Sequence, residues 1–111
     1  MAVKIVRTAL YIRSLKKLGA RAAEIAALEA SVSANPLAGD VIPGLGGVRK
    51  MRFAMAGKGK RGGGWAIYYA VWRGKTVFMI WAYSKSVQED LSSAQRQMVM
   101  TLLEAIKRDE A

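Results

Sequence analysis

Residues 44–69 have the sequence GLGGVRKMRFAMAGKGKRGGGWAIYY, in which two glycine-rich stretches enclose a run of alternating side chains. The alternation predicts a strand over residues 48–56, with cations on one face and apolar side chains on the other. The second glycine-rich stretch, residues 57–64, predicts a loop or hairpin turn, and another strand is expected over residues 65–72. The segment has no acidic residue, and its cations are Arg49, Lys50, Arg52, Lys58, Lys60 and Arg61.

This concentration of positive charge indicates a polyanionic partner. Glycine allows backbone N–H groups to approach phosphates closely, and lysine and arginine neutralise them. A formal net charge of +10 on 111 residues favours nucleic acid, because such a field attracts a polyanion and weakens with salt. The alternative is a solvated hairpin whose charges prevent strands from pairing edge to edge. Neither glycine-rich stretch matches a nucleotide-binding motif, since GxxxxGK[ST] is absent and Gly44–Gly47 leads into a strand.

The composition excludes several classes of protein. The chain has no histidine and no cysteine, which removes the commonest metal ligands, the commonest general base and the Ser–His and Cys–His nucleophiles. We expect no metal site and no cofactor. With 52% hydrophobic residues the chain can bury a core, and its length predicts one domain over residues 1–111. No apolar run approaches the roughly 18 residues of a membrane span. The N-terminus does not match a signal peptide, so we expect a cytoplasmic protein with no membrane partner.

The whole chain predicts an α+β fold with elements in the order β-α-α-β-β-β-α, a small antiparallel sheet with two N-terminal helices and a C-terminal helix. Thr8 is the expected N-cap of the first helix and Gly19 its end. Ser92 and Gln95 have capping-box spacing before the last helix. We expect the helices to cover one face of the sheet and to leave the other free for a ligand. The expected elements are strands at 3–7, 48–56, 65–72 and 76–83, and helices at 9–18, 20–34 and 93–108.

Aromatic side chains concentrate on the last two expected strands, and most of them are expected in the core. Tyr83 is the exception, because it ends its strand beside Lys85, where a phenol could stack on or bond to a nucleotide. Alternation places Trp65, Ile67 and Tyr69 on one face of their strand, and Ala66, Tyr68 and Ala70 on the other. It likewise gives Val77, Met79, Trp81 and Tyr83 a shared face, and the helical period gives the last helix an apolar side of Met98, Val99, Leu102 and Ile106.

Several short motifs follow one another in a fixed order over more than fifty residues. They are Asn35-Pro36, Gly39-Asp40-Val41-Ile42, Gly44, Gly46-Gly47, Arg49-Lys50, the run from Gly57 to Gly63, Ile67-Tyr68-Tyr69, Tyr83, Lys85 and Asp90-Leu91. This ordered set resembles the RelE/HigB superfamily of toxins from toxin–antitoxin systems, and its HigB-like branch in particular. The resemblance covers residues 35–108, whereas the first 34 residues match only in their pattern of a strand and two helices. The family fold coincides with the predicted layout.

The resemblance implies a metal-independent endoribonuclease that enters the ribosomal A site and cuts mRNA there. It also implies a cognate antitoxin, expected to be a helix-turn-helix protein. A ribose 2′-OH attacks the adjacent phosphate and a 5′-OH leaves, which requires a proton acceptor and groups that stabilise the phosphorane. Without histidine, a lysine whose pKa is lowered by neighbouring cations could take the proton, and arginine could bind the phosphate. The resemblance assigns catalytic positions to Lys58, Lys60, Arg61, Tyr83 and Lys85, and RNA-binding positions to Arg49, Lys50, Arg52 and Trp65.

Two positions depart from the family pattern. Trp65 stands where relatives of this branch usually carry an arginine that suits the scissile phosphate, and Val87 stands where the family tends to have glutamate. The chain is therefore either a weakened toxin that binds RNA or the ribosome, or a nuclease in which Arg61 takes the missing role. A basic DNA-binding domain is a third alternative, but no expected helix combines basic residues with a recognition-helix pattern.

Overall fold

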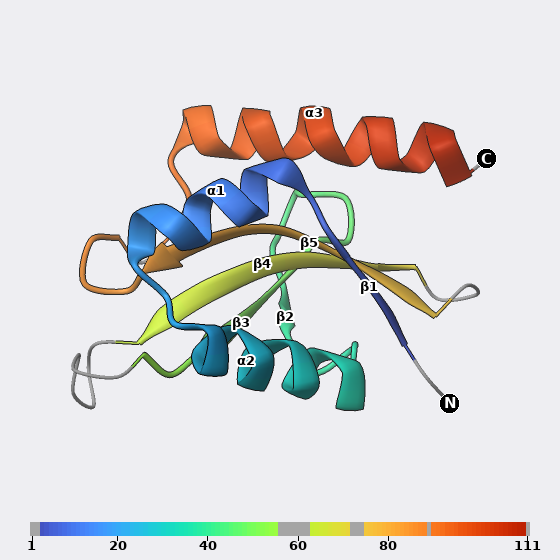
Figure 1. Cartoon of the computed structure of the whole chain (residues 1–111). Helices are drawn as coiled ribbons and strands as arrows, with labels where there is room; N and C mark the ends of the chain where they lie inside the picture. The colour runs from blue at the N-terminus through green and yellow to red at the C-terminus, as the bar shows by residue number, and fades with distance from the viewer. Residues whose placement is uncertain (1–2, 56–62, 72–74, 89, 111) are drawn as a thin grey trace.

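The computed structural model describes residues 3–55, 63–71, 75–88 and 90–110. A five-stranded sheet with the strand order β1-β5-β4-β3-β2 lies at its centre (Figure 1). The predicted α+β class and element order are confirmed. The structure adds the two-residue strand β2, and the β1–β5 pair is parallel while the other pairs are antiparallel. The elements are β1 (Lys4–Arg7), α1 (Ala9–Leu18), α2 (Ala22–Ala34), β2 (Asp40–Val41), β3 (Arg49–Phe53), β4 (Gly64–Val71), β5 (Thr76–Ser84) and α3 (Ser93–Glu110).

The helix ends follow local sequence signals. The Thr8 hydroxyl accepts a hydrogen bond from the Tyr11 backbone N–H at 3.2 Å, as an N-cap does. Gly19 ends α1 with a φ of 73°, a left-handed conformation that glycine adopts without strain. The predicted capping box of α3 is present: the Gln95 N–H donates to the Ser92 hydroxyl at 3.2 Å, and the Ser92 N–H donates to the Gln95 side chain at 2.9 Å. These predicted caps are therefore confirmed. The sequence could predict them because each depends only on residues close together in the chain.

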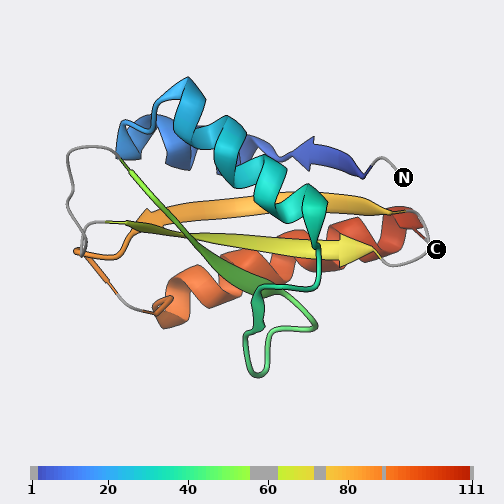
Figure 2. The ribbon, with the colours of Figure 1, turned by 90° about the horizontal axis from the view of Figure 1, so that it is seen from below.

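Both faces of the sheet are covered, so the expectation of a free face is wrong. Figure 2 shows α2 on one side of the sheet and α3 on the other. Helix α3 needs a partner because it carries an apolar stripe, and the apolar side chains of the loop between β2 and β3 pack beside it. The α1–α2 core contains Tyr11, Leu15, Leu28, Val32, Phe53, Met55, Ala66, Tyr68, Val77, Met79 and Ala82. The α3 core contains Ile42, Leu45, Val48, Trp65, Ile67, Ile80, Tyr83, Leu91, Val99 and Leu103.

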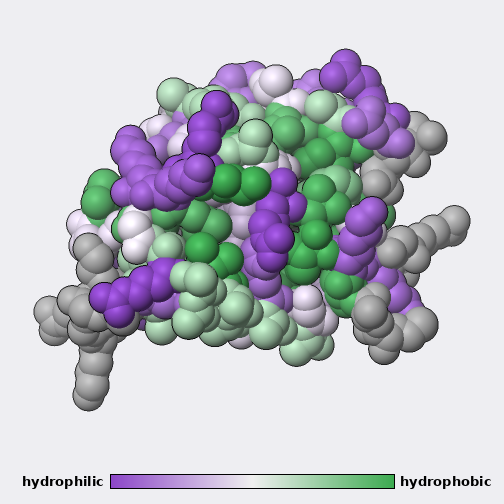
Figure 3. Space-filling model, in the orientation of Figure 1, coloured by the Kyte–Doolittle hydropathy of each residue, from purple (hydrophilic) through white to green (hydrophobic). Residues whose placement is uncertain are grey.

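The outward faces of the two covering helices differ in character. The outer side of α2 is formed mainly by exposed alanines, which give the pale surface along the lower edge of Figure 3.

On α3 the buried stripe is Val99, Leu103 and Ile106, whereas Met98 is 49% exposed. The prediction that Met98 faces the core is wrong, because Val99 and Leu103 are one turn apart and Met98 lies about 100° around the helix from Val99 and about 140° from Leu103.

A β-bulge in β5 changes which side chains share a face. Ile67 pairs with Trp81 but Tyr68 pairs with Met79, so Ile80 is an additional residue in β5. Met79, before the bulge, belongs to the α1–α2 core, and Tyr83, after it, belongs to the α3 core. The predicted shared face of β5 is therefore wrong, because an inserted residue reverses the alternation. The alternation predicted for β4 is confirmed, since Ala66 and Tyr68 lie in one core and Trp65 and Ile67 in the other.

A buried carboxylate joins β1, α1 and α2. Glu29 is 7% exposed and accepts hydrogen bonds from Arg7 Nη2 at 2.6 Å, Arg7 Nε at 2.9 Å and the Tyr11 hydroxyl at 2.9 Å. These donors satisfy a charge that would otherwise be costly to bury. The pKa of Tyr11 is raised, and burial is the largest cause. The negative charge of Glu29 and the hydrogen bond from the Tyr11 hydroxyl to Glu29 raise the pKa further.

This raised pKa predicts a loss of stability in alkali. The folded state holds the Tyr11 proton more tightly than the unfolded chain, so the free energy of unfolding should fall as the pH rises above about 10. Tyr11→Phe should flatten that fall and cost about 1–3 kcal/mol at neutral pH, because Glu29 loses a donor. Urea unfolding between about pH 7 and pH 11.5 measures both effects. The control is Tyr69→Phe, which leaves Glu29 untouched, and an alkaline slope in Tyr11→Phe equal to that of the unmodified protein would contradict the assignment.

Candidate functional site

Trp65 is the centre of a cluster of cations at one end of the sheet. It pairs with Arg52 on β3 and with Tyr83 on β5. The centroid of one Trp65 ring lies 4.4 Å from Lys50 Nζ, 5.7 Å from Arg52 Cζ and 6.0 Å from Lys85 Nζ. All three distances are within the reach of cation–π attraction. Trp65, Lys50, Arg52 and Lys85 are called the Trp65 cluster below.

The indole supports the cations and is not itself a surface for stacking. Trp65 is only 8% exposed and packs in the α3 core, whereas Arg52 is exposed and Lys50 and Lys85 are partly exposed. Like charges brought together repel one another, and the negative face of an aromatic ring offsets part of that repulsion. The indole N–H is buried and has no hydrogen-bond partner among the described residues. The cluster therefore offers a set of cations for binding an anion.

The structure brings together four of the nine predicted site residues, and it places a fifth, Tyr83, beside them. Tyr83 is 6% exposed in the α3 core, so the prediction that it stands apart from the core is wrong. The bulge before it turns the side chain towards α3. Arg49 lies elsewhere, because its guanidinium donates to the backbone carbonyl oxygens of Leu37 at 3.0 Å and Gly39 at 2.8 Å. The predicted catalytic residues Lys58, Lys60 and Arg61 lie outside the described residues.

Two charged residues lie beside the cluster for which the sequence had predicted no function. Asp90 Oδ1 is 3.1 Å from Lys50 Nζ, and the Arg96 guanidinium donates to the Pro43 carbonyl oxygen at 2.7 Å. Lys50, Tyr83, Asp90 and Arg96 all line a hollow of about 350 Å³. The sequence showed Asp90 as part of a family motif without a function. No signal indicated Arg96, which reaches this end of the sheet because α3 begins there.

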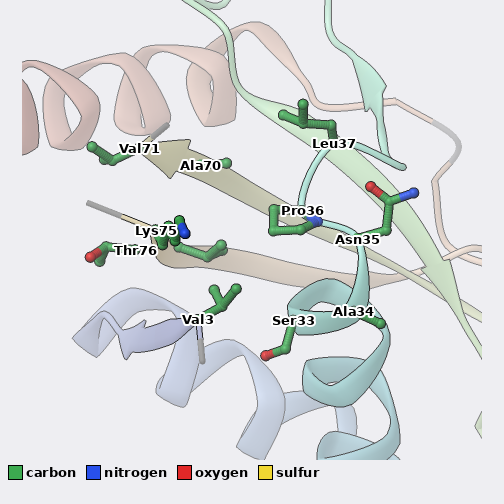
Figure 4. A pocket seen from close by; sticks show the side chains of 11 residues that line it. Val3, Ser33, Ala34, Asn35, Pro36, Leu37, Ala70, Val71, Lys75 and Thr76 are labelled. Carbon is green, nitrogen blue, oxygen red and sulfur yellow. The ribbon is translucent and has the colours of Figure 1, made fainter. Parts of the chain in front are cut away.

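A second hollow lies at the opposite end of β4. It has a volume of about 590 Å³ and is formed by the end of α2, the following loop, the start of β5 and residues near β1 and the end of β4 (Figure 4). Its described lining holds one cation, Lys75, among mostly small and apolar side chains. This composition does not match phosphate binding, so the Trp65 cluster is the better candidate site.

Neither a metal-binding group of side chains nor a membrane-spanning helix is found in the described part of the chain. No group of three or more Asp, Glu, His or Cys side chains there is placed to hold a metal ion. None of the described helices is long and apolar enough to cross a membrane.

The architecture around this cluster is a RelE-like fold. Among solved structures, the chain is similar to that of the E. coli toxin RelE, in a variant with two arginines replaced by alanine and in the free state. The TM-score is 0.54 with 17% sequence identity, over 80% of this chain and 90% of that chain. No family model matches the sequence. At this identity the likeness establishes the fold, and the HigB-like branch stays a prediction.

The burial of Trp65 predicts the outcome of placing an arginine at this position. Trp65→Arg should lower the free energy of unfolding by about 2–4 kcal/mol, because it removes a large core side chain and adds a fourth cation to three. Trp65→Phe keeps an aromatic ring and is the matched control, with a smaller expected loss. Urea unfolding compares the two variants. A Trp65→Arg protein as stable as the unmodified one would show that the α3 core does not depend on the indole.

Proposed function

We propose that this protein is the toxin of a toxin–antitoxin module, a ribosome-dependent mRNA endonuclease that inhibits translation. The proposal treats residues 1–111 as one toxin domain of the HigB-like branch. The RelE-like fold supports it, and the observation that carries it is the gathering of three cations from β3 and the end of β5 on one indole. Such a set can hold the closely spaced phosphates of a single RNA strand.

In the proposed reaction the cations act on the scissile phosphate. A base takes the proton of a ribose 2′-OH as its oxygen attacks the adjacent phosphorus, and a pentacoordinate phosphorane forms. The bond from phosphorus to the 5′-oxygen then breaks, an acid gives that oxygen a proton so that it leaves as a 5′-OH, and a 2′,3′-cyclic phosphate remains. Arg52 is exposed, and its planar guanidinium can bind two phosphate oxygens at once. Lys85 follows β5 directly and approaches the same indole. We propose that Lys58, Lys60 and Arg61, with Tyr83 and Lys85, complete the acid–base and charge-stabilising groups, and that the reaction needs no metal.

The second candidate function is a ribosome- or RNA-binding module without turnover. Its specific support is Trp65, which holds the position of the family arginine but is buried and contributes no charge. Loss of one preorganised charge-stabilising group costs about 10²–10³ in rate at comparable sites. Both candidates require ribosome binding through the Trp65 cluster, and only the first produces new mRNA 5′ ends.

One experiment tests both candidates. The variant Arg52→Gln with Lys85→Gln should bind ribosomes more weakly, and the slope of log affinity against log salt should fall by about one to two. The control, Lys4→Gln with Lys75→Gln, makes the same change in net charge at exposed residues beside the start of β5, the opposite end of that strand from Lys85. Co-sedimentation with ribosomes at several salt concentrations measures binding, and primer extension on a reporter mRNA in a translating extract detects cleavage.

The outcomes separate the candidates. New 5′ ends that require the unmodified cluster support the nuclease. Cluster-dependent ribosome binding without new 5′ ends supports the binding module. Equal binding by the cluster variant and the Lys4→Gln, Lys75→Gln control contradicts both.

We further propose that an acidic segment of a helix-turn-helix antitoxin covers the same basic face, because an uncovered +10 protein attracts RNA without specificity. Arg52→Glu with Lys85→Glu should then weaken the complex at least about tenfold through repulsion of acidic side chains. Size-exclusion chromatography of the co-expressed pair detects this loss. Lys16→Glu with Lys17→Glu is the charge-matched control. A cluster variant that still elutes with its antitoxin, while the α1 variant does not, would place the contact on the N-terminal helices.

A further inference from the structure

The hollow beside the Trp65 cluster has the chemistry of a nucleotide site. Its volume is about 350 Å³, at the small end of the range of ligand pockets. It lies between the segment after β2, the end of β5 and the start of α3. One part of its lining is polar and one part apolar. The polar side chains are Lys50, Tyr83, Asp90 and Arg96, and the apolar ones are Val41, Ile42, Pro43 and Leu91.

The polar part combines two cations, a phenol and one carboxylate. Lys50 contacts the Asp90 carboxylate at 3.1 Å and also lies 4.4 Å from the centre of the Trp65 ring. Arg96 gives one hydrogen bond to the Pro43 carbonyl oxygen, and a guanidinium has five N–H donors. Lys50 therefore belongs both to the hollow and to the Trp65 cluster. A strand of RNA whose phosphate is held by the cluster would bring its neighbouring nucleotide to the hollow.

Asp90 is held here by an interaction that a phosphate can replace. Its side chain is 82% exposed, whereas that of Lys50 is 19% exposed. Exposed ion pairs contribute little to stability, and a phosphate offers more acceptor oxygens than a carboxylate to the same cation. The apolar part of the lining includes Val41, an exposed large hydrophobic side chain on β2. It gives a sugar or base an apolar surface next to the cations.

We propose that this hollow binds one nucleotide of single-stranded RNA, and that Asp90 occupies the place of its phosphate in the unbound protein. The phosphate would be bound by Lys50 and Arg96, and the sugar or base would lie against Val41 and Pro43. Asp90 then limits RNA affinity until the phosphate displaces it. This inference rests on the proposed function and defines a binding position beyond the Trp65 cluster.

The test uses substitutions matched in charge. Asp90→Asn keeps the shape of the side chain and removes the competing charge, so it should bind a ten-nucleotide single-stranded RNA about 3- to 10-fold more tightly than Asp109→Asn. Asp109→Asn makes the same change in net charge at the exposed end of α3. Arg96→Gln should weaken binding about 3- to 10-fold relative to Arg108→Gln, its matched control in the last turn of α3. Fluorescence anisotropy at constant salt measures all four affinities, and thermal unfolding checks that each variant is folded.

Equal affinities of Asp90→Asn and Asp109→Asn would overturn the proposal, as would equal affinities of Arg96→Gln and Arg108→Gln. So would an Asp90→Asn protein that is less stable without a gain in affinity, because Asp90 would then only brace the chain. Inorganic phosphate and a dinucleotide, added as competitors, distinguish a general phosphate site from a nucleotide site. Equal competition by inorganic phosphate would overturn the nucleotide assignment. Absence of measurable binding of the ten-nucleotide RNA by the unmodified protein would also overturn the nucleotide site. Each of these results leaves the proposed function standing, because ribosome binding and cleavage of mRNA in a translating extract test that function separately.

Discussion

Burial of β4 on both faces is the constraint on which the rest of the structure depends. Its residues from Gly64 to Tyr68 are all buried, so each neighbouring side chain belongs to one of two cores. Gly64 marks the tight end of the β3–β4 pair, since a Cβ there would lie 2.6 Å from the Phe53 ring. With that register fixed, Arg52 lies opposite Trp65. The strand that joins the two cores thus also positions the cationic cluster.

The bulge at Ile80 connects the packing of the sheet to the candidate site. Without an additional residue in β5, the alternation set by Met79 would direct Tyr83 towards the α1–α2 core. With it, Tyr83 packs in the α3 core beside Trp65 and lines the hollow together with Lys50. Bulges often occur next to functional sites because they redirect a side chain. One irregular residue therefore decides which face of the sheet Tyr83 packs on.

The charged side chains discussed above form two groups, one that holds elements of the fold together and one that lies around Trp65. The Arg7–Glu29 pair lies where three elements meet, and its buried carboxylate has several donors. Around Trp65 the structure describes three cations near the ring, Lys50, Arg52 and Lys85, and one ion pair, between Asp90 and Lys50. A buried aromatic ring permits this arrangement because it attracts cations without neutralising them. The three cations can therefore lie close together beside a single side chain.

The sequence by itself determined the α+β class, the element order, the helix caps and the alternation of β4, because each depends on residues close together in the chain. It also located the cationic segment, and it named the residues of the Trp65 cluster through a family resemblance. It did not determine that α3 covers the second face, that Tyr83 turns into the core, or that Asp90 and Arg96 lie beside Lys50. Lys50 and Asp90 are 40 positions apart. Their contact exists only after strand register, the bulge and the docking of α3 are fixed together, and local patterns carry no information about such distant pairings.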